Sequence, residues 1–192
     1  METEQKVQIN TSAPLFEAKA YHNNTEIKVK LNTYKGKWII LFFYPADFTF
    51  ICPTELGDLA DHYEEIKKLE TEVLSISTDT VFVHKAWHDH SETIKKIKFP
   101  MVADPTGNIC RAYNTYIPEE GLSLRGTFII DPEGILRCYE INANNIGRNT
   151  LELIRKLNAA QFVYKHGAEV CPVNWQPGNK TLKPSLELVG KL

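Results

Sequence analysis

The feature that most constrains the fold is an unbroken apolar run over residues 38–44, with the sequence WIILFFY. A strand that is buried on both faces has this composition, because polar residues alternate on neither side. From residue 53 onward, apolar residues instead recur every three or four positions with charges between them, which indicates an amphipathic helix. The apolar positions of this helix are Leu56, Leu59, Tyr63, Ile66 and Leu69. A buried strand that leads straight into a helix predicts an α/β fold.

The flanking segments continue this alternation of strands and helices. A hairpin is expected over 16–31, and a second one over 126–140 turns at Asp131–Gly134, where proline and glycine favour a tight turn. The other expected elements are strands at 72–78 and 100–103 and helices at about 83–97 and 149–164. The β-α-β-α-β order implies parallel pairing with right-handed crossovers. We therefore predict a thioredoxin-like α/β fold: a mixed central sheet with helices on both faces, an N-terminal hairpin at one edge and an extended C-terminal arm.

Length and composition indicate one main domain. The chain has 192 residues, of which 43% are hydrophobic, and no linker-like stretch interrupts its middle. That is enough for one substantial core. Beyond Gly167 the sequence is rich in proline and glycine and has no apolar period. We predict a thioredoxin-like domain over residues 1–167 and an arm over 168–192.

The charge balance and the hydropathy exclude several classes of partner. With 22 basic and 24 acidic residues the formal charge is −2, and no basic cluster could neutralise a run of phosphates, so nucleic acid is not an expected partner. No apolar run approaches the roughly 18 residues of a membrane span, and the N-terminus lacks the apolar core of a signal peptide. A cytoplasmic location without a membrane partner is the expectation.

Cys52 lies where the buried strand turns into the helix, in the first helical turn and next to Pro53. Open α/β sheets bind ligands at this carboxyl end of their strands. The positive end of the helix dipole and its unpaired N–H groups favour thiolate over thiol there. A buried cysteine is often only a small hydrophobic residue, but this position favours a reactive thiol.

A helix end does not by itself keep such a cysteine ionised at neutral pH. Free cysteine has a pKa of about 8.5, and lowering it by two units needs about 2.7 kcal/mol, whereas a helix end supplies roughly 0.3–2 kcal/mol. Thr49 can add a hydroxyl donor, because it lies three residues upstream on the same turn. Arg125 can add a positive charge if its strand lies next to the central strand. Both are therefore candidate site residues.

The string Pro45-x-x-x-Thr49-x-x-Cys52, followed by PTE, resembles the peroxidatic signature of the typical two-cysteine peroxiredoxins. The likeness extends over nearly the whole chain. The stretches that are similar to the bacterial alkyl hydroperoxide reductase C branch of that family are STDTVFVHKAWH, RGTFIIDPEG, AEVCPVNW and PSLELVGKL. The resemblance implies a thioredoxin-like fold, a thiol-dependent peroxidase acting on hydrogen peroxide and organic hydroperoxides, and no metal or organic cofactor.

The resemblance also implies a role for each residue around the motif. Cys52 is expected to be the peroxidatic nucleophile, and Pro45 to shield its thiolate. Thr49 and Arg125 are expected to hold both the thiolate and the peroxide oxygens, with Glu55 orienting the arginine. Such fixed donors stabilise charge as it moves from sulfur to the leaving oxygen.

A second thiol is needed to reverse the sulfenic acid that peroxide leaves on Cys52. No C-x-x-C pair is present, so a distant cysteine must serve. Cys171 lies in the irregular arm, where the backbone can approach a distant partner, whereas Cys110 and Cys138 lie in expected regular elements and are expected to be inert. We therefore predict that Cys171 is the resolving cysteine.

The resemblance implies further partners. It places the cysteine that matches Cys171 in the opposite subunit of a homodimer, and rings of five such dimers, or decamers, are common among the relatives. The expected electron donor is a flavin-containing disulfide reductase, with thioredoxin as the alternative.

Three histidines, His84, His88 and His90, suggest a metal site at first, because residues four apart share a helix face. No H-E-x-x-H pattern or carboxylate at ligand spacing accompanies them, so solvated or packing roles are favoured and no metal is expected. Trp87 lies between them, in a segment similar to one that lines the family's site, and is expected to be a supporting residue.

Two other classes of function remain open on the sequence. A thioredoxin-like disulfide oxidoreductase would use the same fold, although the missing C-x-x-C pair argues against it. An oligomeric holdase chaperone would use exposed apolar surface and would not need Cys52. Consumption of hydrogen peroxide with a thiol reductant, lost in Cys52→Ser, separates all three.

Overall fold

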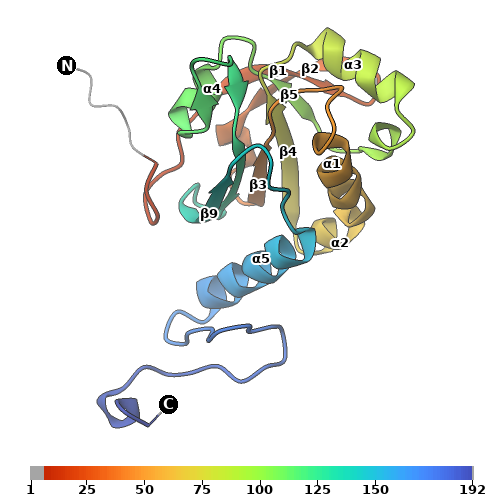
Figure 1. Cartoon of the computed structure of the whole chain (residues 1–192). Coiled ribbons are helices and arrows are strands. Elements are labelled where there is room, and N and C mark those ends of the chain that lie inside the picture. Colours follow the sequence, from red (N-terminus) through yellow and green to blue (C-terminus); the bar gives the residue numbers. More distant parts are fainter. Residues whose placement is uncertain (1–6, 192) are drawn as a thin grey trace, which may run out of the picture. The chain divides into compact units, whose positions relative to one another are not determined.

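The structure, a computed structural model, describes residues 7–191, which contain a central mixed sheet and helices that flank it (Figure 1). Within these residues the main sheet has seven strands in the order β2-β1-β5-β4-β3-β8-β9. The strands are β1 (Glu17–His22), β2 (Thr25–Lys30), β3 (Trp38–Phe43), β4 (Thr71–Ser77), β5 (Met101–Ala103), β8 (Arg125–Ile130) and β9 (Leu136–Asn142). The helices are α1 (Cys52–Asp61), α2 (Tyr63–Lys68), α3 (Val81–His90), α4 (Asn108–Ala112) and α5 (Thr150–Lys165), with single 3-10 turns η1 (Leu31–Tyr34), η2 (Ile94–Lys96) and η3 (Leu186–Leu188).

The strand pairing confirms the predicted mixed, thioredoxin-like sheet. Strands β3, β4 and β5 pair in parallel, as the β-α-β-α-β order requires. Strands β8 and β9 add an antiparallel hairpin next to β3, and the β1–β2 hairpin occupies the opposite edge of the sheet. All six residues of β3 are buried, which accounts for its continuous apolar sequence.

The side chains of β3 alternate between two apolar layers. Ile39, Leu41 and Phe43 belong to one core cluster together with Ile109 and Cys110 of α4. The side chains between them point to the other face, which α1, α2 and α3 cover in Figure 1. Helices therefore flank the sheet on both faces, as predicted.

Two predicted helices are shorter than expected. The helix expected from Pro53 to Leu69 is divided into α1 and α2 at His62, whose backbone angles (φ −96°, ψ 1°) depart from those of an α-helix. Its N–H still donates to the Asp58 carbonyl oxygen at 3.2 Å, and its Nδ1 lies 2.9 Å from the same oxygen. The helix expected at about 83–97 ends at His90. Ser91 adopts extended backbone angles, and its hydroxyl oxygen accepts a hydrogen bond from the Ile94 N–H, so a new turn begins there.

The turn between β8 and β9 has the predicted sequence and geometry. The Asp131 carboxylate accepts hydrogen bonds from the N–H groups of Glu133 (3.0 Å) and Ile135 (2.8 Å), and Gly134 takes a positive φ of 85°. A second, two-stranded hairpin of β6 (Tyr116–Ile117) and β7 (Leu122–Ser123) was not predicted. Strands of two residues are too short to carry a readable period.

The chain divides into two compact units between Thr150 and Leu151. The first unit contains the sheet, and the second contains most of α5 and the arm, where Val170 and Leu182 form an isolated antiparallel bridge. The division of the chain into a domain over 1–167 and an arm over 168–192 stays a prediction. Among the described residues, no helix is long and apolar enough to cross a membrane.

Candidate active site

Cys52 is the first residue of α1, and its side chain is completely buried (0% exposed). The chain reverses between β3 and α1 at Phe48, whose φ of 53° lies in the left-handed region that residues other than glycine seldom adopt. Ile51 at the N-cap makes no side-chain cap hydrogen bond. The positive end of the α1 dipole therefore acts on the sulfur without a capping side chain in between.

Arg125 is the first residue of β8, the strand that pairs with β3, and its buried guanidinium contacts the sulfur. Its Nη1 donates to Cys52 Sγ at 3.4 Å and to Glu55 Oε2 at 2.7 Å. Nε and Nη2 both donate to the main-chain oxygen of Asn144, at 3.0 and 2.7 Å. Four hydrogen bonds thus hold the positive charge in one orientation beside the thiol.

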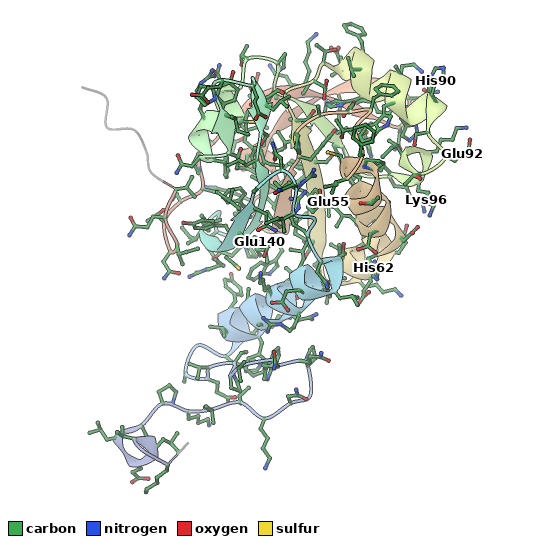
Figure 2. All side chains as sticks on the ribbon, in the orientation of Figure 1. Glu55, His62, His90, Glu92, Lys96 and Glu140 are labelled. Carbon is green, nitrogen blue, oxygen red and sulfur yellow. The ribbon has the colours of Figure 1, made fainter. Side chains whose placement is uncertain are left out.

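Glu55 lies one helical turn after Cys52 and is also buried (5% exposed). Figure 2 labels it on α1, on the side toward the sheet. Besides Arg125, its carboxylate accepts hydrogen bonds from the main-chain N–H, Nε and Nη2 of Arg148, at 2.8, 2.9 and 3.0 Å. Burial on its own raises the pKa of Glu55, but the hydrogen bonds and charge of Arg148 and the charge of Arg125 reverse that effect and leave the pKa below its ordinary value of 4.5. The carboxylate is therefore ionised between two guanidinium groups.

Arg148 is a site residue that the sequence did not indicate. Its Nη1 donates to the Gly126 oxygen (2.9 Å) and to Thr127 Oγ1 (3.0 Å), and its guanidinium stacks 3.4 Å from the centre of the Phe42 ring. Burial lowers the pKa of Arg148, and Glu55 opposes that shift. Arg148 lies 93 residues from Glu55 in an irregular loop before α5, so no local pattern could have linked the two.

Pro45 and Thr49 lie in the segment that connects β3 with α1. Pro45 is buried directly after Tyr44, and Thr49 is half-buried. The Thr49 hydroxyl donates to the Ala46 carbonyl at 2.9 Å. Its oxygen is thereby oriented to accept a hydrogen bond from a ligand, whereas the sequence had suggested it as a donor to the sulfur.

Trp87 supports this turn from α3. Its ring is buried (3% exposed), and its centre lies 6.2 Å from that of Tyr44 and 6.0 Å from that of Phe48. These aromatic contacts connect α3 with the residues on both sides of Pro45. The supporting role of Trp87 in the site stays a prediction.

A buried polar network lies under the same turn. Asp47 accepts a hydrogen bond from the Tyr44 hydroxyl (2.7 Å), and its other oxygen lies 2.8 Å from His84 Nδ1. The Nε2 atom of His84 lies 3.3 Å from the Val102 carbonyl oxygen, and the Asp47 N–H donates to Asp79 at 2.8 Å. Both ring nitrogens of His84 thus contact protein groups, which is the packing role favoured for it. Among residues 7–191, no three His, Cys, Asp or Glu side chains lie close enough to share a metal ion.

Comparisons with known proteins agree on one family. The family model described as AhpC/TSA matches residues 9–139, and the C-terminal domain of 1-Cys peroxiredoxin matches residues 159–192. Alkyl hydroperoxide reductase C of Salmonella typhimurium is 53% identical, over 96% of this chain and 98% of its own length. The crystal structure of Enterococcus faecalis AhpC has a TM-score of 0.83 and 51% identity, covering 85% of this chain and 98% of that chain. The reduced 2-Cys peroxiredoxin of Plasmodium vivax has a TM-score of 0.91 and 35% identity, covering 95% and 96%.

The chain belongs to the AhpC/TSA family. It is a peroxiredoxin, and its enzyme class is that of the thiol-dependent peroxidases. The thioredoxin-like fold and the family resemblance inferred from the motif around Cys52 are confirmed. The peroxidase interpretation is supported over a disulfide oxidoreductase or a holdase chaperone.

The other cysteines of this peroxiredoxin have different surroundings. Cys110 is completely buried in α4, where burial and the nearby Asp104 carboxylate raise its pKa to about 12. Cys138 lies half-buried on β9. In the C-terminal unit Cys171 is half-buried, and its thiol donates to the Ala159 carbonyl at 3.9 Å.

Proposed function

We propose that this peroxiredoxin reduces hydrogen peroxide and organic hydroperoxides, with Cys52 as the attacking thiolate and Cys171 of the partner subunit as the resolving thiol. The observation that carries the proposal is the Arg125 guanidinium, which donates to both Cys52 Sγ (3.4 Å) and Glu55 (2.7 Å) in a site buried from water. A fixed positive charge there stabilises negative charge on the sulfur and on an oxygen bound next to it.

In the first step the Cys52 thiolate attacks the terminal oxygen of the hydroperoxide. The S–O bond forms as the O–O bond breaks, and the departing alkoxide or hydroxide takes a proton to leave as an alcohol or water. Arg125 is held so that it faces both the sulfur and the incoming oxygens, because Glu55 and the Asn144 carbonyl fix its guanidinium. The Thr49 oxygen accepts a hydrogen bond from the hydroperoxide O–H, since the Thr49 hydroxyl itself donates to the Ala46 carbonyl.

In the second step the Cys171 thiolate attacks the sulfur of the Cys52 sulfenic acid. The S–S bond forms and hydroxide leaves, taking a proton to become water. A dithiol reductase then returns two electrons and restores both thiols. We assign this role to a flavin-containing disulfide reductase, with thioredoxin as the alternative donor, in the cytoplasm where thiols are kept reduced.

We infer a homodimer, and a decamer of five dimers, as the working assembly. The sheet ends in β2 on one side and in β9 on the other, and a terminal strand of this kind can pair with a strand of a second subunit. Exposed aromatic side chains, Phe48 (57% exposed) in the active-site turn and Phe82 (77% exposed) in the first turn of α3, support a further contact between dimers. Sedimentation velocity of the reduced protein at micromolar concentration tests both levels, and a monomer at all concentrations would exclude them.

The cysteine pairing can be tested by electrophoresis. Treatment with one equivalent of peroxide, followed by non-reducing denaturing electrophoresis, is expected to convert the monomer band into a covalent dimer. Cys171→Ser is expected to leave the first turnover intact but to stop cycling with a disulfide reductase. Cys110→Ser and Cys138→Ser are the matched controls and should retain both the dimer band and the turnover. Normal steady-state turnover of Cys171→Ser would show that the resolving residue is wrong.

A further inference from the structure

The C-terminal unit holds Cys171 against one face of α5. Arg155, Ala159 and Phe162 lie about one helical turn apart along that face. The Cys171 thiol donates to the Ala159 carbonyl at 3.9 Å, and the centre of the Trp175 ring lies 4.9 Å from that of Phe162. The part of the arm from Cys171 to Trp175 therefore folds back along α5.

The segment from Cys171 to Trp175 is a closed turn and not a loose chain. The Trp175 N–H donates to the Pro172 carbonyl at 3.2 Å, and the Trp175 indole N–H donates to the Asn179 carbonyl at 3.2 Å. Trp175 is buried (3% exposed), although the arm around it is mostly exposed. One large buried side chain thus anchors the turn that carries the thiol.

Arg155 of α5 connects the helix with this turn through the hydrogen bonds of its guanidinium. Its Nη1 donates to the Trp175 carbonyl at 3.4 Å, while Nε and Nη2 donate to the Glu152 carboxylate at 2.6 and 2.8 Å. The bidentate pair with Glu152 fixes the plane of the guanidinium. Its third nitrogen is thereby directed at the turn that carries Cys171.

Within this unit the charged groups that face Cys171 are Arg155 from α5 and Glu169 from the arm. Burial raises the pKa of the Cys171 thiol, the positive charge of Arg155 opposes that rise, and the negative charge of Glu169 adds to it. Lys183 and Thr181 in turn contact the Glu169 carboxylate. Arg155 is therefore the group of this pair that favours the thiolate.

We propose that Arg155 is a positioning residue for the resolving step: it holds the Cys171–Trp175 turn on α5 and places the positive charge that stabilises the attacking thiolate. The inference rests on the proposed role of Cys171. Attack on the sulfenic acid requires the deprotonated sulfur, so the rate of disulfide formation follows the thiolate fraction of Cys171. A cation fixed on the same helix raises that fraction at neutral pH.

The test is the pH dependence of the resolving step alone. Reduced protein is mixed with one equivalent of hydrogen peroxide, quenched with acid at millisecond intervals, alkylated and analysed by mass spectrometry for Cys52 sulfenic acid and for the disulfide. For Arg155→Gln, disulfide formation is expected to be roughly three- to tenfold slower at pH 7, with its pH midpoint displaced upward by a corresponding amount. Formation of the sulfenic acid should keep the wild-type rate, because Arg155 takes no part in the peroxide step.

Two further variants separate charge from packing. Arg155→Lys keeps the positive charge and is expected to keep the wild-type pH midpoint. Lys165→Gln removes an exposed charge from the last turn of the same helix and should leave both rate and midpoint unchanged. An Arg155→Gln profile that is slowed equally at every pH, or not slowed at all, overturns the inference. Cys171→Ser, measured alongside, separates this failure from failure of the proposed function, because a disulfide that still forms in that variant means the resolving thiol lies elsewhere.

Discussion

Cys52 and Cys110 are both completely buried and both belong to a helix that follows a strand of the sheet, yet their surroundings have opposite chemistry. Cys52 receives a hydrogen bond from a guanidinium, whereas the N–H of Cys110 donates to the Asp104 carboxylate at 2.8 Å, which brings a negative charge near the thiol. Burial and that charge raise the pKa of Cys110 to about 12. Burial alone therefore does not decide which cysteine reacts, and the sign of the neighbouring charge does.

The topology of the sheet explains this difference. Cys52 follows β3, whose neighbour β8 begins with Arg125, so the positive charge arrives from an adjacent strand. Cys110 follows β5, and the loop between them carries Asp104. The hydroxyl groups of Thr115 and Ser123 complete a buried polar cluster there. A buried cysteine in a helix after a strand thus becomes a reactive site in one case and an inert one in the other.

The largest expected effect is loss of peroxidase activity on replacing the reactive cysteine. Cys52→Ser should reduce peroxide consumption with a thiol reductant to the uncatalysed background, because a serine hydroxyl is not ionised at neutral pH and is a poor nucleophile. Cys110→Ser, equally buried, should retain activity within about twofold, since this thiol takes no part. Stopped-flow peroxide consumption measures both. Equal losses in the two variants would show that the contrast between the sites is structural and not chemical.

The charge beside Cys52 can be removed while the sulfur is kept. Arg125→Met is expected to slow the reaction of Cys52 with hydrogen peroxide by about 10²–10³-fold, the typical cost of losing a donor to a developing negative charge. Arg111 provides the control, because it stacks 3.8 Å from the centre of the Tyr116 ring, away from the site. Arg111→Met should react at the wild-type rate under pseudo-first-order conditions. A wild-type rate for Arg125→Met would disprove the electrostatic role.

The carboxylate between the two arginines is expected to contribute stability that depends on pH. Glu55→Gln should lower the free energy of unfolding at pH 7 by about 3–5 kcal/mol, the usual cost of removing one partner of a buried ion pair. The pKa of Glu55 is lowered in the folded state, so its contribution is complete above the ordinary value of 4.5 and is lost as the pH falls through the lowered one. The difference between the two proteins in urea unfolding should therefore shrink in acid.

A matched control for this measurement is available on the surface. Glu92, labelled in Figure 2, is 89% exposed and pairs with Lys95. Glu92→Gln should unfold at the wild-type urea midpoint at every pH. If Glu55→Gln lowers the free energy of unfolding by the same amount at every pH, the effect is due to packing and the ion-pair explanation is wrong.

The smallest expected effect concerns the inert cysteine. With a pKa of about 12 and no exposed surface, Cys110 should remain unmodified by iodoacetamide in the folded protein at pH 8 and become alkylated only in urea. Cys138 is half-buried and serves as an internal reference for partial access. Peptide mass spectrometry after timed alkylation distinguishes Cys110 from Cys138. Labelling of Cys110 as early as that of Cys138 would contradict the description of Cys110 as a buried, unreactive thiol.

Much of the fold was predictable because its signals are local. The apolar run of β3, the periodicity after Pro53 and the Asp131–Gly134 turn each depend on neighbouring residues, and the structure agrees with all three. The helix ends were less predictable. The backbone leaves the helical angles at His62, and the Ser91 hydroxyl caps a new turn, and neither feature interrupts the apolar period of the sequence.

The candidate site was predictable only in part, because only some of its residues are close together in the sequence. Cys52, Thr49 and Pro45 belong to one continuous motif, whereas Arg125 was a candidate only on the condition that its strand lies next to the central strand, which the pairing of β8 with β3 meets. Arg148 and the Asn144 carbonyl come from a loop without any period, and they meet the site only through tertiary packing. Such contacts depend on the geometry of the whole sheet, which no single stretch of sequence records.

The wide separation of the site residues along the chain has a consequence for biosynthesis. Glu55 and Arg148 are 93 residues apart, and Arg125 follows Cys52 by 73. At a synthesis rate of about 5–20 residues per second, a ribosome needs roughly 5–20 s between making the carboxylate and making its second arginine. During that interval the nascent chain carries Cys52 without the groups that stabilise its charge. We expect the newly made thiol to gain its reactivity toward peroxide only when β8 and the loop after β9 have folded onto β3, so that an unfinished chain is spared oxidation.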